Sequence, residues 1–263
     1  MDDSLTLLSK YRAQLMGIAI FSILAYHIPH EWFHLTFPLN LIRHYFYFGV
    51  DVFFFLSGFG IYFAFNKRQS LKEFYMRRIR RILPYSYPVM FVSAFVLFYR
   101  GEVNVIELIE MIFILDFWIE GFLYDWYIPV ALFFYLITPV IMKYILKNPY
   151  IKVFSIFLLC NIVIIFFYKD NLSLVLARFP LYCIGIVFAA MLANKRKISV
   201  LYLIVSLVIG SVLLAVNYWY EIAGNKFWEY YTNYTAFFFL APPACLYVAK
   251  LFSLVKNYPF PFL

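Results

Sequence analysis

The sequence predicts an all-α, polytopic integral membrane protein, a bundle of about eight spanning helices plus one interfacial or re-entrant helix. Three observations lead to this prediction. Hydrophobic residues make up 65% of the 263 residues and charged residues only 14%, whereas soluble domains are near half apolar and a quarter charged. The apolar residues gather in runs of about 20, the length that crosses a bilayer. Basic residues collect between alternate runs, as in cytoplasmic loops.

The expected spans follow the apolar runs, because a helix satisfies all of its own backbone polar groups inside the hydrocarbon region. In chain order the spans are 13–28, 45–65, 82–99, 126–146, 150–168, 174–193, 199–219 and 233–252. The first is short unless its helix begins before Lys10. Since no Gly/Ser linker, repeat or soluble segment interrupts them, we expect one membrane domain over residues 1–263.

The segment 105–118 differs from the spans, because it is about 14 residues long and carries acidic residues at helical spacing. Such a segment suits the membrane surface or a re-entrant loop. The charge distribution agrees. With a cytoplasmic N-terminus and eight spans, every strongly basic segment lies inside; a ninth span would place those at Lys143 and Lys195 outside. We therefore predict that 105–118 does not span.

Composition also limits the class of protein. The net charge of +8 follows from the clustered loop residues, and a chain this apolar is not a soluble nucleic-acid binder. Cys160, Cys183 and Cys245 lie in apolar runs and are odd in number, which predicts buried thiols instead of disulfides. The N-terminus begins with acids and has no cleavage site of small residues, so we expect the first span to be retained.

Ionisable side chains inside the predicted spans are candidates for function, because burying them in a bilayer is costly. His27, Asp51, Asp125 and Arg178 fall at a similar depth in the predicted outer half, which indicates a polar cavity opening outward. An imidazole suits a general base near neutral pH. The alternative for His27 is a histidine that is merely hydrogen-bonded at headgroup level. Asp51 has two candidate partners, His27 and Arg178.

A basic cluster precedes the third predicted span. Arg77, Arg78, Arg80 and Arg81 form two overlapping R-x-x-R pairs. Residues three apart share a face of a helix, and paired guanidinium groups can bind a phosphate in a bidentate manner. The alternative is a patch that sets topology and contacts lipid headgroups.

Five segments then point to a family. In chain order they are MGIAIFSILAYH (16–27), FGVDVFFFLSGF (48–59), FYMRRIRRILPYSYP (74–88), DWYIPVALFFYLITP (125–139) and RFPLYCIGIVF (178–188). Together they resemble motifs of the acyltransferase family 3 membrane proteins, which O-acetylate bacterial surface polysaccharides and related glycans. The resemblance covers about residues 10–190 and is weaker beyond.

The resemblance implies an O-acyltransferase of the bacterial inner membrane, with acetyl-CoA as the acyl donor and no metal or nucleic acid. The acceptor would be a polysaccharide or glycolipid, and the partners would be the bilayer and envelope-polysaccharide biosynthesis proteins. The implied site has three groups: catalytic His27 and Asp51; donor-binding Arg77, Arg78, Arg80 and Arg81; and acceptor-binding Asp125, Trp126 and Arg178. His27 would either act in proton transfer or carry the acyl group.

The chain departs from the family pattern at three places. Met16 stands where the family usually has an arginine or lysine, and Arg12, one turn below, is about 22 Å along a helix from His27. Ala131 replaces a common acid, for which Asp125 is a candidate substitute. The chain also ends early, at Leu263. These departures leave a second function open: a non-catalytic membrane protein that binds or transports a glycolipid or anion.

Overall fold

The computed structural model describes residues 4–29, 36, 39–67, 70–121, 126–167 and 170–255, and every regular element in these ranges is a helix. Seven of the described helices are long and apolar enough to cross a membrane. An N-terminal pair, bent by 67°, makes an eighth if it forms one broken span. The predicted all-α polytopic fold is therefore confirmed.

The elements, of which η2 is a 3-10 turn, are α1 (Ser4–Lys10), α2 (Arg12–His27), α3 (Leu39–His44), η2 (Tyr45–Tyr47), α4 (Phe48–Phe65), α5 (Leu71–Tyr99), α6 (Val105–Ile112), α7 (Asp116–Ile119), α8 (Tyr127–Ile145), α9 (Pro149–Phe166), α10 (Asp170–Ala193), α11 (Val200–Ile222) and α12 (Lys226–Leu254). Seven of the predicted spans fall on the seven long helices, and the first falls on α2 of the bent N-terminal pair.

The third span differs most from its predicted bounds. Helix α5 begins at Leu71, well before residue 82, because a capping box starts it. The Ser70 hydroxyl accepts a hydrogen bond from the Glu73 amide at 3.2 Å, and the Glu73 carboxylate accepts one from the Ser70 amide at 3.3 Å. The arginine cluster, placed by the sequence prediction in a loop, therefore lies on the first turns of α5.

The segment 105–118 is not among the candidate spans of the described chain, in agreement with the prediction. A second capping box, made by Asn104 and Glu107, starts α6. The helix stops at Ile112, and Ile114 has a φ of 62°, a region that a β-branched residue rarely adopts. The chain thus turns sharply between α6 and α7.

Helices α4 and α10 form the centre of the bundle and make one of its two most extensive helix contacts; α11 and α12 make the other. A β-carbon at Gly58 of α4 would overlap the carbonyl oxygen of Tyr182, and one at Gly185 of α10 would overlap that of Phe55. The two backbones therefore approach as closely as small residues allow.

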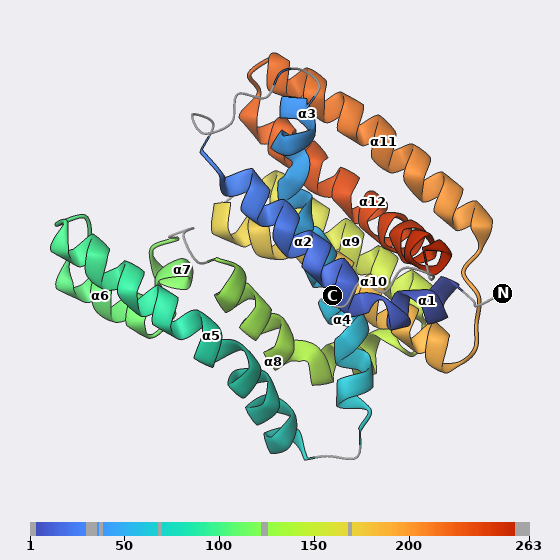
Figure 1. Ribbon diagram of the computed structural model, residues 1–263, viewed down its shortest axis with the longest axis horizontal. Helices are drawn as coiled ribbons and strands as arrows, with labels where there is room; N and C mark the ends of the chain where they lie inside the picture. The colour runs from blue at the N-terminus through green and yellow to red at the C-terminus, as the bar shows by residue number, and fades with distance from the viewer. Residues whose placement is uncertain are drawn as a thin grey trace.

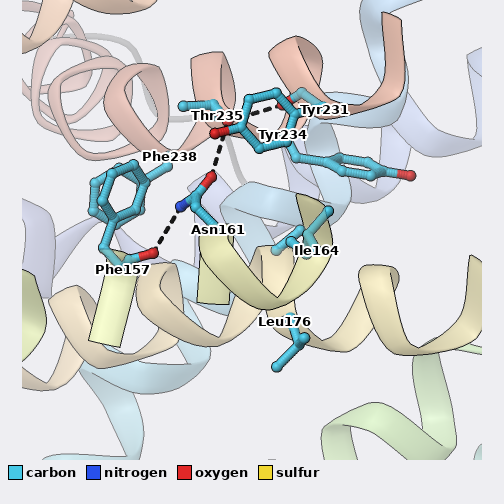
Figure 2. A pocket seen from close by; sticks show the side chains of 9 residues that line it. Phe157, Asn161, Ile164, Leu176, Tyr231, Tyr234, Thr235 and Phe238 are labelled. Atoms are coloured by element: carbon cyan, nitrogen blue, oxygen red, sulfur yellow. Dashed lines mark hydrogen bonds between the residues drawn. The ribbon is translucent and has the colours of Figure 1, made fainter. Parts of the chain in front are cut away.

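The other helices surround this central pair. Figure 1 shows α5 and α6 projecting on one side of the bundle and α11 with α12 on another. Helix α9 packs against α10, and its Asn161 accepts a hydrogen bond from Thr235 of α12 at 3.4 Å (Figure 2). The three cysteines are buried and unpaired, as predicted.

The glycine contact gives a test of the fold. Gly58→Leu and Gly185→Leu should each lower the free energy of unfolding of the detergent-solubilised protein by at least about 1–3 kcal/mol. The added side chain forces α4 away from α10. Ala215→Leu, at an exposed position on α11, is the matched control. Thermal unfolding measures all three, and equal melting temperatures would contradict the packing described here.

Candidate functional site

Asp51 of α4 and Arg178 of α10 form a buried ion pair. The Asp51 Oδ1 atom lies 3.6 Å from Arg178 Nε, and each side chain is 3% exposed. Of the two partners considered for Asp51, the structure places Arg178 next to it. No hydrogen bond or ion pair among the described residues joins Asp51 to His27.

The close helix contact explains why these two charges meet. Gly58 follows Asp51 by seven residues, and Gly185 follows Arg178 by seven. Seven residues are about two helical turns, so each glycine shares a face with the charged residue on its own helix. Where the glycines bring the two backbones together, the charged side chains two turns away are brought together as well.

Two aromatic rings hold the Arg178 guanidinium on its other sides. Its Cζ atom lies 4.8 Å from the centroid of the Trp126 ring and 4.4 Å from that of the Tyr234 ring, within range of cation–π attraction. The Nη1 atom has no hydrogen-bond partner among the described residues. Arg178 is therefore fixed in place while it keeps a donor for another group.

Arg178 lines a cavity of about 390 Å³, which we call the histidine cavity because His27 and His44 also line it. The remaining lining residues include Tyr26, Tyr47, Trp126, Lys226, Glu229, Tyr230, Asn233 and Tyr234. The cavity thus combines aromatic faces with cationic, acidic and amide side chains. Its composition is that of a site for a polar organic ligand.

His27 owes its position to the end of α2. Pro29 follows, and a proline disfavours helical backbone in the residue before it, so Ile28 is extended with ψ of 128°. The buried Arg43 side chain donates a hydrogen bond to the Ile28 carbonyl at 2.9 Å. His27 is therefore the last residue of α2. Its ring packs edge-on against the Tyr26 ring, with the two centroids 5.1 Å apart.

Sequence analysis missed several residues of the histidine cavity. His44 lies 3.7 Å from a carboxylate oxygen of Glu221. Glu229, 9% exposed, accepts a hydrogen bond from Lys226 at 2.9 Å. Asn233 is 4% exposed, and its Oδ1 atom has no partner among the described residues. The buried polar residues at 229 and 233 lie one turn apart on α12, a signal that the sequence contained.

A second cavity, of about 140 Å³, is lined by three arginines: Arg12, Arg78 and Arg81. We call it the arginine cavity. Arg78 and Arg81 form one of the two predicted R-x-x-R pairs. Arg77 and Arg80, the other pair, are exposed and are not among its lining residues. Two of the four clustered arginines thus line this cavity and two do not.

Arg12 joins this cavity from α2. Its Nε atom donates a hydrogen bond to the Leu56 carbonyl at 3.0 Å, and its guanidinium lies over Gly60, where a β-carbon would overlap it. Met16 lines the same cavity one turn further along. The cavity therefore contains a guanidinium from α2 although position 16 is not basic.

The two cavities lie toward opposite ends of α2 and approach each other at an aromatic partition. On α4, Val50 lines the histidine cavity and Phe53 lines the arginine cavity. At the start of α8, Trp126 lines the histidine cavity and Tyr127 lines the arginine cavity. The Phe53 and Tyr127 ring centroids are 6.0 Å apart, and those of Phe54 and Trp126 are 6.2 Å apart. Aromatic rings thus lie between the guanidinium groups of the arginine cavity and the two histidines.

Fold and site together define a polytopic membrane protein with an arginine-lined and a histidine-lined cavity at the two ends of one helix. The acyltransferase family 3 profile, described as "Acyltransferase domain", matches residues 15–257. The chain belongs to this family and is a multi-pass membrane acyltransferase. The match extends past residue 190, beyond the motifs identified in the sequence. No curated protein and no solved structure matches the chain.

The structure places most of the predicted site residues in or beside these cavities. His27, Trp126 and Arg178 line the histidine cavity, and Asp51 lies behind Arg178. Asp125 lies outside the described residues. Ala131 is buried in the apolar core. The described residues contain no cluster of three or more His, Cys, Asp or Glu placed to hold a metal ion.

The buried pair gives a second test, by a double-mutant cycle. Asp51→Asn or Arg178→Gln alone should cost about 3–5 kcal/mol, because each leaves an unpaired buried charge. The double variant should lose clearly less than the sum, as measured by thermal unfolding in detergent.

The exposed pair Arg100–Glu102, at 2.8 Å, is the control. There Glu102→Gln should change stability by less than about 1 kcal/mol. Strict additivity of the Asp51 and Arg178 substitutions would contradict a direct interaction between the two side chains.

Proposed function

We propose that the chain is an O-acyltransferase of the bacterial inner membrane that moves an acetyl group from acetyl-CoA to a sugar hydroxyl of a polysaccharide or glycolipid. The observation that carries the proposal is the pair of cavities toward opposite ends of α2. One is suited to phosphate groups and the other to a polyol, and a family match to acyltransferases covers both.

The arginine cavity is the proposed donor site. Arg78 and Arg81 lie three residues apart on α5, with Arg12 facing them from α2. Guanidinium groups bind phosphates by paired hydrogen bonds, a geometry that lysine does not offer. The phosphates of coenzyme A would bind here from the cytoplasmic side, and the pantetheine arm would extend toward the aromatic partition.

The histidine cavity is the proposed acceptor site. Its tyrosine and tryptophan rings offer flat faces to a sugar, and Glu229 and Asn233 offer buried hydrogen-bond acceptors to its hydroxyls. The unpartnered Nη1 of Arg178 supplies a donor on the same wall. Such a site binds through several short polar contacts around one ring, which orients a single hydroxyl for reaction.

The proposed reaction is a direct acyl transfer. The sugar oxygen attacks the thioester carbonyl carbon, and His27 takes the hydroxyl proton. The carbon–sulfur bond then breaks, and the thiolate of coenzyme A receives that proton from the imidazolium, which restores neutral His27. Arg178 is the proposed donor to the carbonyl oxygen as negative charge develops on it. Asp51 keeps Arg178 in position.

The membrane placement follows from the same proposal. In the proposed orientation, the basic segments, the N-terminus and the arginine cavity face the cytoplasm, where acetyl-CoA is made. The histidine cavity then faces the cell envelope, where the acceptor glycan and the proteins that assemble it would be met.

Donor binding gives a third test. Arg78→Gln or Arg81→Gln should weaken acetyl-CoA binding about 10–100-fold, the loss expected for one charge-assisted hydrogen bond. Arg77→Gln and Arg80→Gln, on the same turns but outside the cavity lining, should have much smaller effects. Isothermal titration of the detergent-purified protein measures each variant. Equal losses at all four positions would indicate a diffuse electrostatic field, and the donor site would be misplaced.

The base gives a fourth test. His27→Asn should lower the rate of acetyl transfer about 10²–10⁴-fold and leave acetyl-CoA affinity unchanged. The measurement is transfer of ¹⁴C from acetyl-CoA to base-labile esters on the polysaccharide of expressing cells. His44→Asn is the comparison, because His44 lines the same cavity. Loss of transfer in the His44 variant, with normal transfer in the His27 variant, would assign the base to His44.

A further inference from the structure

A third cavity opens beside the arginine cavity, between α5 and α8. Helix α5 lies along the edge of the bundle (Figure 1), and most of its surface is exposed. Near its start, the Tyr75 hydroxyl donates a hydrogen bond to the Leu136 carbonyl of α8 at 3.0 Å. Beyond that contact the two helices enclose a groove of about 450 Å³.

Apolar side chains line almost all of this lateral groove. Ile79 and Leu83 face it from α5, Leu132 and Leu136 from α8, and Phe113 and Ile114 from the turn between α6 and α7. The left-handed backbone of Ile114 belongs to this turn, and such conformations persist only where the surroundings impose them. The groove lies between two candidate membrane spans, so its natural contents are hydrocarbon.

One end of the groove is cationic. Arg78 lines it next to Tyr75, with the guanidinium 5.8 Å from the ring centroids of both Phe74 and Tyr135. Its Nε atom is buried and has no hydrogen-bond partner among the described residues. No acidic residue is among the groove's lining residues. A guanidinium donor at the end of an apolar trough complements an anion that carries an alkyl chain.

We propose that the lateral groove binds one anionic membrane lipid, with its phosphate on Arg78 and one acyl chain along α8. From Leu136 to Pro129 the groove follows α8 for about 10 Å, so the chain would run from the arginine end toward the α6–α7 turn. A phosphate headgroup on Arg78 would lie at the depth where basic residues meet headgroups. This binding does not depend on acyl transfer.

Photo-crosslinking in lipid nanodiscs tests the proposal. Phosphatidylglycerol and phosphatidylcholine probes, each with a diazirine in one acyl chain, are compared at equal content in the full-length protein. The phosphatidylglycerol probe should label peptides of residues 113–136 several-fold more strongly. Arg78→Gln should remove this preference, whereas Arg77→Gln should keep it.

A second variant tests the position of the acyl chain. Leu132→Trp should fill the groove and abolish labelling there, whereas Leu207→Trp, on an exposed part of α11, should not. Equal labelling by the two lipids, or unchanged labelling in Leu132→Trp, would overturn the proposal. Loss of the preference in excess inorganic phosphate would also overturn it, by showing a site for a soluble anion. None of these outcomes depends on acetyl-CoA binding, so the lipid site and the proposed enzyme can fail separately.

Discussion

The contact between α4 and α10 is the constraint on which the rest of the structure depends. Gly58 and Gly185 leave no room for a β-carbon between the two backbones, and the resulting proximity places Asp51 against Arg178. A buried charge pair adds little net stability but is costly to break. In this protein the pair fixes the position of Arg178. Asp51 holds its side chain on one side, and the rings of Trp126 and Tyr234 enclose it on the others.

The two cavities are built from the same few helices, at different heights. Helix α2 carries Arg12 at one end and His27 at the other. Successive turns of α4 line the two cavities, as do Trp126, just before α8, and Tyr127, its first residue. Only a layer of rings around Phe53 and Tyr127 separates the proposed phosphate site from the proposed sugar site. For the proposed transfer, the acyl thioester would have to cross that layer while its nucleotide stayed on the arginines.

Hydropathy and charge predicted the fold well because the bilayer restricts spanning segments to long apolar helices. Some residues in or beside the cavities, such as His27 and Arg178, were also predicted, since ionisable groups in spans are rare, whereas His44, Glu229 and Asn233 were not. The sequence prediction placed the start of α5 too late in the chain. A capping box at Ser70 starts the helix, although the residues that follow are polar. The sequence did not show that Arg78 and Arg81, but not Arg77 and Arg80, would line a cavity with Arg12, because this depends on how α2, α4 and α5 are rotated against each other.

The central claim is that the arginine and histidine cavities open to opposite sides of the membrane. Single cysteines at Arg81 and Lys226, which line the two cavities, test it directly with a membrane-impermeant maleimide, because the native cysteines are buried. The account predicts labelling of Arg81→Cys only from the cytoplasmic face of oriented vesicles and of Lys226→Cys only from the opposite face. Labelling of both variants from the same face would contradict it.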